Sequence, residues 1–204
     1  MKNIYKLLAF FTILGAAYYV WYVHFNFRFE EISKGKVYRS ALIPPDKLES
    51  YLIKNKIKTV VDLLDPGVQD ALNPAQLKDI IAEDDAIKAI NKKNNLNIRH
   101  INIPSGQVPN KKNLINFYKV LDDPTSYPIL IHCYHGTGRA AMYSALYRIE
   151  HDNHTNEEAR QKTRFMVQGF GYKSSFSDGR EKGKFLINYK KRDTGKNATL
   201  NTMK

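Results

Sequence analysis

The pattern of apolar and polar residues along the chain predicts strands that alternate with helices. The predicted strands are residues 37–40, 59–64, 97–103 and 129–132. The predicted helices are residues 47–55, part of 70–95 with a loop at 91–95, 110–121, 140–150 and 155–168. Strands and helices in this order indicate an α/β fold, in which helices flank a central, mostly parallel sheet.

The N-terminal segment has a different pattern, because residues 7–23 form an uncharged apolar run. The run approaches the length of roughly 17–25 residues that a spanning helix needs, and aromatic residues gather at its far end. We therefore predict an N-terminal transmembrane helix. A cleaved signal peptide is the rival interpretation, since residues 15–17 are small and offer a cleavage site.

The same patterns divide the chain into four parts. Residues 1–24 are the membrane anchor or signal segment, and 25–36 are a polar and aromatic connector. Residues 37–192 form one folded domain, and 193–204 form a basic, polar tail that we expect to be disordered. The lysines before the apolar run favour a cytoplasmic N-terminus, so we predict that the domain lies outside the cytoplasm. The basic residues of the connector, on the other side of the run, weaken this prediction.

The formal charge of +12 narrows the choice of partners. Such a charge suits an anionic substrate or an anionic membrane surface. No nucleic-acid motif accompanies the basic C-terminal region, so we expect no nucleic acid partner. The single cysteine, Cys133, excludes an internal disulfide framework.

The segment from residue 129 to 139 carries the candidate chemistry. A short apolar strand leads to Cys133, and Gly136 and Gly138 let the following loop turn tightly before the predicted helix. Loop N–H groups at a helix N-terminus bind phosphate and favour a thiolate, while Arg139 can hold two phosphate oxygens. We predict Cys133 and Arg139 as catalytic residues. The predicted phosphate-binding residues are Tyr134, His135, Gly136, Thr137, Gly138 and Arg139.

His132 and Cys133, followed after five residues by Arg139, resemble the signature of the cysteine-dependent phosphatases. The runs 37–41, 57–63 and 185–189 are similar to bacterial dual-specificity-type members of the tyrosine phosphatase superfamily. The resemblance covers residues 36–192. It implies a tyrosine phosphatase-like fold, a cysteinyl-phosphate mechanism without metal or cofactor, and a role for His132 in bracing the loop with a ring N–H.

The chain departs from the family pattern in two places. The family's general acid is an aspartate about thirty residues before the cysteine, but no Asp or Glu occurs between Asp85 and Asp122. Asp65 is the alternative candidate, with Asp84 and Asp85 behind it. Ala140 stands where relatives carry a hydroxyl that eases departure of the thiolate, so we expect slow turnover of the phosphoenzyme unless Thr137 substitutes.

Three functions therefore remain open. The first is a tyrosine or dual-specificity protein phosphatase acting on a phosphorylated protein. The second is a phosphatase for inositol phosphates or phosphoinositide headgroups, which the positive charge, the membrane segment and His135 in the loop support. The third is a phosphate-binding pseudophosphatase. In a Gram-negative bacterium the domain would be periplasmic, either membrane-anchored or released after cleavage.

Overall fold

The computed structural model describes residues 2–67, 74, 76–164 and 173–193. The chain forms two compact units, Met1–Ala141 and Met142–Lys204. The first unit contains the whole sheet and the candidate loop, so it holds the site predicted from the sequence.

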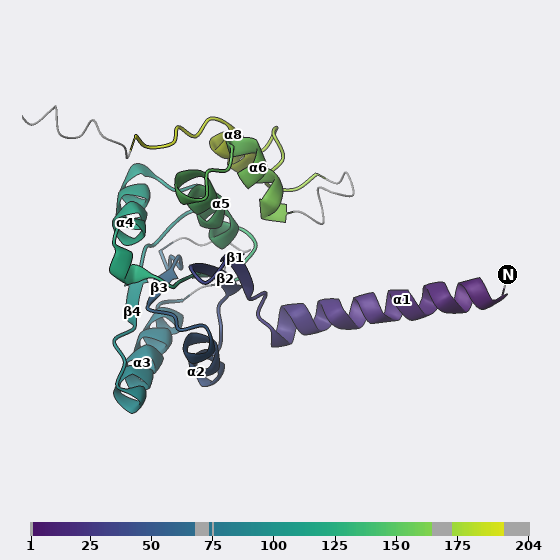
Figure 1. Ribbon diagram of the computed structural model, residues 1–204, viewed down its shortest axis with the longest axis horizontal. Helices are drawn as coiled ribbons and strands as arrows, with labels where there is room; N and C mark the ends of the chain where they lie inside the picture. The colour runs from purple at the N-terminus through teal and green to yellow at the C-terminus, as the bar shows by residue number, and fades with distance from the viewer. Residues whose placement is uncertain (1, 68–73, 75, 165–172, 194–204) are drawn as a thin grey trace, which may run out of the picture. The chain divides into compact units, whose positions relative to one another are not determined.

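The sheet has five strands in the order β1-β2-β5-β3-β4 (Figure 1). Only β1 and β2 pair antiparallel, which confirms a mostly parallel sheet. β5, the strand that leads to Cys133, lies in the middle of the order, between β2 and β3. The bounds are β1 Glu30–Ser33, β2 Val37–Ala41, β3 Thr59–Asp62, β4 Arg99–Asn102 and β5 Ile129–Cys133.

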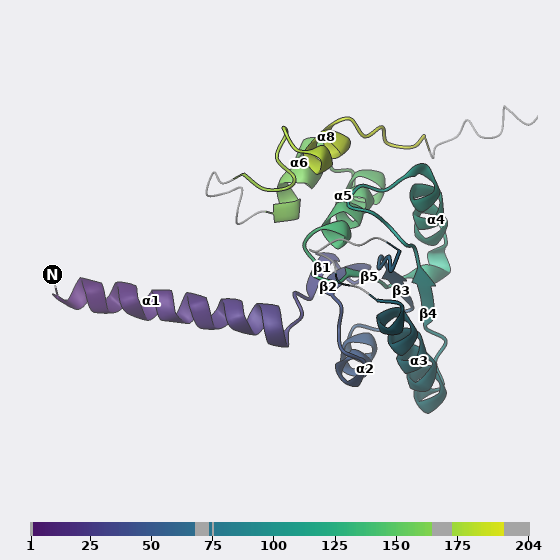
Figure 2. The ribbon, with the colours of Figure 1, turned by 180° about the vertical axis from the view of Figure 1, so that it is seen from behind.

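Helices cover both faces of this sheet, with α2 and α3 on one face and α4 on the other (Figures 1 and 2). Local signals start them: Pro45 opens α2 at its first turn, and the Asn110 side chain accepts a hydrogen bond from the N–H of Asn113 to cap α4. The bounds are α2 Pro45–Lys54, α3 Leu77–Asn94, α4 Lys111–Leu121, the 3-10 turn η2 Pro124–Ser126, and α5 Arg139–His151, which continues into the second unit.

The core between the sheet, α2 and α3 follows from the alternation of side chains along each strand. Tyr38, Val60 and Leu130 stand at paired positions of β2, β3 and β5, so their side chains leave the sheet on the same face. They join one buried cluster with the inner faces of α2 and α3. The buried members of the cluster that come from the helices are Leu48, Leu52, Ile87 and Ile90.

The structure corrects several sequence-based boundaries. β1 occupies part of the predicted connector, where it pairs with β2 through a register shift at residues 31–33. α3 continues to Asn94 instead of ending before a loop at 91–95, because Asn95 ends it in the left-handed conformation. The helix predicted over 155–168 is α6 Asn156–Gln161 followed by the 3-10 turn η3 Lys162–Arg164, and 165–168 lie outside the described residues.

The second unit holds the end of α5 together with α6, η3 and α8 Glu181–Ile187. Glu150 holds the C-terminal segment of this unit in place. Its carboxylate accepts a hydrogen bond from the Tyr189 hydroxyl and another, of 2.9 Å, from the Arg192 side chain. Gly183 has no room for a side chain, because a Cβ there would lie 2.0 Å from the Ser177 carbonyl oxygen. The predicted tail from residue 194 onward lies outside the described residues.

The N-terminal segment forms α1 Lys2–Val20 and a π-helical turn, η1 Trp21–Phe25. Residues 4–25 are long and apolar enough to cross a membrane, and their most apolar window is not buried within the structure. A signal sequence has the same properties, so this finding is compatible with either interpretation.

Candidate active site

The predicted phosphate loop lies at the carboxyl end of the central strand. β5 ends at Cys133 and α5 begins at Arg139, so residues 134–138 connect the two elements. Ligands of parallel α/β folds bind at this edge of the sheet, and the helix N-terminus adds a positive field. The structure therefore brings all the predicted phosphate-binding residues into one strand-to-helix turn.

Gly136 is the residue that lets this loop pack against β2. Its φ is +71°, and a Cβ at this position would lie 2.6 Å from the Ala41 nitrogen and 2.7 Å from the Ser40 carbonyl carbon. The hydrogen bond from the Leu42 N–H to the Tyr134 carbonyl, at 3.2 Å, joins the same two segments. Any side chain at 136 would push the loop away from β2.

The connector also touches the loop. The Arg28 side chain donates a hydrogen bond of 2.9 Å to the carbonyl oxygen of His135. Phe27, one residue earlier, accepts a hydrogen bond of 2.8 Å from the Ala41 N–H at the end of β2. This role of Arg28 could not be predicted from the sequence, because a single arginine in a connector carries no signal for such a contact.

The two predicted catalytic side chains are both buried within the first unit. Cys133 is a free thiol and is 3% exposed. The Nη1 atom of Arg139 donates to the carbonyl oxygens of Leu63 at 2.6 Å and Ser105 at 2.9 Å. These carbonyls come from the loops that follow β3 and β4, so the guanidinium is fixed by the ends of two strands.

His132 faces away from the loop, toward a buried cluster of charged groups. Its Nε2 atom lies 2.9 Å from Oε2 of Glu83 on α3 and 3.7 Å from Oδ1 of Asp62 on β3. Nε2 of His100, on β4, lies 3.3 Å from the same Glu83 oxygen and 3.8 Å from Oδ2 of Asp62. We call these four residues the acid–histidine cluster.

The pKa values in the cluster describe ion pairs. Burial by itself raises the pKa of Glu83, but the charges of His132 and His100 outweigh it and lower this pKa to about 2. Burial by itself lowers the pKa of His100, yet the Asp62 and Glu83 carboxylates raise it to about 10. The pKa of His132 is raised in the same way, mainly by the charge of Glu83.

These directions fix how the cluster stabilises the fold. The Glu83 contribution is complete above its usual pKa of 4.5 and is lost as the pH falls toward 2. The His100 contribution is complete below its usual pKa of 6.5 and is lost as the pH rises toward 10. Both contributions are therefore largest between these two usual pKa values.

The ligand atoms of Asp62, Glu83 and His132 lie within 4.8 Å of one another, which is close enough for one metal ion. The imidazoles face the carboxylates, and Asp62 also accepts hydrogen bonds from the Leu64 N–H at 2.7 Å and from Asn102 Nδ2 at 2.8 Å. Opposite charges and neutral donors therefore account for the contacts, and we assign no metal to the cluster.

Of this cluster the sequence predicted a role only for His132, although one signal pointed to Glu83 as well. Glu83 precedes Ile87 by four residues and Ile90 by seven, so it shares the buried face of α3. A carboxylate in such an apolar stripe is almost never fully buried unless it is paired. Its histidine partners, His132 and His100, come from two separate strands, and the helical pattern could not identify them.

The three acid candidates lie in different places. Asp65 stands two residues after Leu63, whose carbonyl binds Arg139, and its Oδ1 atom accepts a hydrogen bond of 2.9 Å from the Gly67 N–H. Asp84 contacts His100 at 3.2 Å and Lys88 at 2.5 Å. The side chain of Asp85 is 69% exposed. Only Asp65 is placed on a segment that reaches Arg139.

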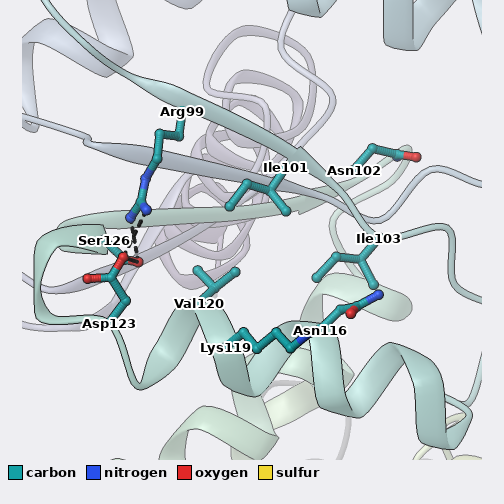
Figure 3. A pocket seen from close by; sticks show the side chains of 9 residues that line it. All are labelled: Arg99, Ile101, Asn102, Ile103, Asn116, Lys119, Val120, Asp123 and Ser126. Carbon is teal, nitrogen blue, oxygen red and sulfur yellow. Dashed lines mark hydrogen bonds and ion pairs between the residues drawn. The ribbon is translucent and has the colours of Figure 1, made fainter.

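A cavity of about 310 Å³ lies elsewhere in the first unit, between β4 and α4 (Figure 3). Across its edge Arg99 pairs with Asp123 at 2.8 Å and donates to the Ser126 hydroxyl at 2.6 Å. The residues that line it include no cysteine and none of the loop residues 132–139. It is therefore separate from the candidate active site.

A family model described as "DSP-PTPase phosphatase fused to NAD+ Kinase" matches residues 32–178. Curated proteins give no match to the sequence. The matched range contains the whole sheet except the first two residues of β1, the candidate loop and the acid–histidine cluster.

Solved structures share the fold at low sequence identity. The catalytic domain of the PP-IP phosphatase Siw14 from S. cerevisiae is 17% identical, with a TM-score of 0.54 over 79% of this chain and 85% of that chain. TpbA from P. aeruginosa is 21% identical, with a TM-score of 0.53 over 79% and 84% of the two chains. A TpbA variant has been solved in complex with pTyr, with 20% identity, a TM-score of 0.53 and coverage of 80% and 84%.

Proposed function

Because the chain belongs to the family of dual-specificity-type phosphatase domains described as fused to NAD+ kinase, we propose that it hydrolyses phosphate monoesters through a cysteinyl-phosphate intermediate. We propose a tyrosine or dual-specificity protein phosphatase as the specific activity. One observation carries the proposal: Cys133 and Arg139 stand at the two ends of one tight turn at the carboxyl end of the central strand.

The reaction has two steps. The Cys133 thiolate attacks phosphorus, an S–P bond forms, and the P–O bond to the leaving group breaks as the departing oxygen takes a proton. Water then attacks the phosphorus, the S–P bond breaks, and inorganic phosphate and the thiolate are released. The loop N–H groups and Arg139 stabilise the phosphoryl oxygens in both steps, so no step needs a metal ion.

The leaving group needs a proton, and Asp65 is the residue that we propose as its donor. It follows the segment whose Leu63 carbonyl binds Arg139, whereas Asp84 is engaged with His100 and Lys88. General acid assistance contributes about 10²–10⁴ to the rate, so an aryl phosphate with a good leaving group depends on it least.

Ala140 gives a prediction about the second step. It follows Arg139, is fully buried and has no hydroxyl to assist departure of the Cys133 thiolate. With p-nitrophenyl phosphate we expect a burst of one p-nitrophenol per protein followed by slow turnover. Ala140→Ser should raise the steady-state rate about fivefold, because one hydrogen bond to the departing sulfur would lower the barrier by about 1 kcal/mol. The amplitude of the burst should become smaller.

The control for this prediction is Ala141→Ser, since Ala141 is the next residue of α5 and is equally buried. Stopped-flow absorbance of p-nitrophenol measures both phases. If wild type shows no burst, or if both serine variants accelerate turnover alike, the second step is not limited by the missing hydroxyl at position 140.

A second candidate function, hydrolysis of phosphoinositide headgroups, is favoured by the connector. η1 ends at Phe25, and Arg28, three residues later, bonds to the loop carbonyl of His135 at 2.9 Å. Three residues span at most about 10 Å, so an apolar helix that crosses a membrane would keep the loop close to the lipid surface. We propose this helix as a membrane anchor, with the domain outside the cytoplasm.

The test compares three substrates with the full-length protein in detergent micelles. Phosphate release is measured from a phosphotyrosyl peptide, from a soluble inositol polyphosphate and from a phosphoinositide in mixed micelles. We expect the peptide to give the highest kcat/KM. Preference for the phosphoinositide would support the second function, and turnover of none of them by a folded protein would leave phosphate binding as the activity.

A further inference from the structure

Glu83 is a charged residue that is buried in the core, although we assign it no part in substrate binding. It is 2% exposed and lies on the core side of α3, among the apolar residues Ile87 and Ile90. A carboxylate in such a position is costly unless a cation compensates it. The ion pair with His132, at 2.9 Å, is the shortest contact that it makes with the two imidazoles.

The other members of the acid–histidine cluster leave Glu83 as the principal partner of His132. Asp62 lies farther from His132, at 3.7 Å, and its two oxygens accept hydrogen bonds from neutral N–H groups. His100 faces Glu83 at 3.3 Å and has Asp84 against its other ring nitrogen at 3.2 Å. Glu83, Asp62 and His100 are thus the titratable groups that face His132 from α3, β3 and β4.

The position of His132 in the chain connects this cluster to the chemistry. His132 immediately precedes Cys133 at the end of β5, and consecutive side chains of a strand point to opposite faces. Its ring therefore points to the α3 face while the thiol lies on the other face, one residue away. A cation held there in a low-dielectric interior stabilises a neighbouring thiolate.

We propose that Glu83 is a positioning residue for the phosphatase reaction, which holds the His132 imidazolium beneath the phosphate loop and thereby keeps the Cys133 sulfur as a thiolate. The inference rests on the proposed function, because it gives the thiolate the role of nucleophile. Glu83 touches neither the substrate nor the sulfur and acts only through His132.

The single cysteine makes a direct test possible, since every thiol signal from this chain comes from Cys133. The rate of alkylation by iodoacetamide is followed against pH for the full-length protein in detergent micelles. We expect Glu83→Gln to be alkylated about tenfold more slowly than wild type near neutral pH, with a pH midpoint about one unit higher.

Matched variants separate this effect from a general loss of charge or of fold. Asp85→Asn removes one negative charge from the same helix, where the side chain is 69% exposed, and should alkylate as wild type does. Glu83→Asp retains the charge on a shorter side chain and should give an intermediate rate. In a His132→Asn background, Glu83→Gln should not change the alkylation rate further, because Glu83 acts on the sulfur only through the His132 ring, which is absent in that background.

The basic side chains on the loop side, Arg139, Arg28 and His135, are unchanged in all these variants. Circular dichroism and thermal unfolding establish that each variant is folded. If Glu83→Gln does not fold, Glu83→Asp decides the test, and wild-type alkylation in that variant overturns the proposal. A folded Glu83→Gln that is alkylated at the wild-type rate overturns it as well.

Two further outcomes distinguish this proposal from the proposed phosphatase activity and from a metal site. Alkylation does not require turnover, so slow alkylation of Glu83→Gln beside an inactive wild type would support the Glu83–His132–Cys133 link and reject the phosphatase activity. Zinc titration of the wild type is the second measurement. One tightly bound zinc ion that is lost in Glu83→Gln would overturn the proposal, because Glu83 and His132 would then be metal ligands.

Discussion

Replacing Cys133 with serine is expected to abolish phosphatase activity while leaving phosphate binding in place. A serine hydroxyl is protonated at neutral pH and is a far weaker nucleophile than a thiolate, so kcat should fall by a factor on the order of 10⁵. The loop N–H groups and Arg139 do not depend on the sulfur, and the substitution exchanges a single atom, sulfur for oxygen, in a buried side chain. Phosphotyrosyl peptide affinity should therefore stay within a few-fold of wild type.

Phosphate release and peptide affinity, measured on the same preparations, check this expectation. Ser174→Ala, a substitution in the second unit, serves as the preparation control and should be as active as wild type. If Cys133→Ser retains more than a trace of the wild-type rate, the sulfur is not the nucleophile. If the wild type is also inactive but both proteins bind the peptide equally well, the chain is a phosphate-binding pseudophosphatase.

Replacing Arg139 with lysine is expected to lower kcat/KM by a factor of about 10²–10³. This is the usual loss of rate when a hydrogen-bond donor that stabilises the transition-state charge is removed. Arg139 combines two tasks, since its Nη1 atom binds the Leu63 and Ser105 carbonyls while the guanidinium serves the phosphate. A lysine ammonium has no planar fork and cannot meet both demands in the same geometry. We also expect a stability loss of about 1–3 kcal/mol, because a buried carbonyl loses its donor.

Steady-state kinetics with p-nitrophenyl phosphate and urea unfolding measure the two effects separately. Arg180→Lys, at an exposed position outside the first unit, is the control and should change neither value. Wild-type kcat/KM in Arg139→Lys would contradict the assignment of Arg139 to the transition state. A loss of stability without a loss of rate would reduce Arg139 to a structural role.

The elements that could be read from the sequence are those fixed by local patterns. The strands at Thr59–Asp62 and Ile129–Cys133 are apolar runs bounded by turn signals, and α4 begins at its own capping residue, Asn110. The connector was harder, because β1 is a short edge strand whose residues are mostly polar or partly exposed. Nothing local distinguishes such a segment from a loop until β2 provides its partner.

The sequence by itself was enough to predict the candidate nucleophile, the arginine and the turn between them, because these residues lie within seven consecutive positions and their spacing is set by the chain. Only the tertiary structure decided what surrounds them. Arg28, Ser105 and Glu83 reach the site from a connector, a loop and a helix that are distant in sequence. Such contacts depend on how the parallel strands are ordered in the sheet. The side-chain periodicity of one segment predicts whether it is a strand or a helix, but it does not specify that order.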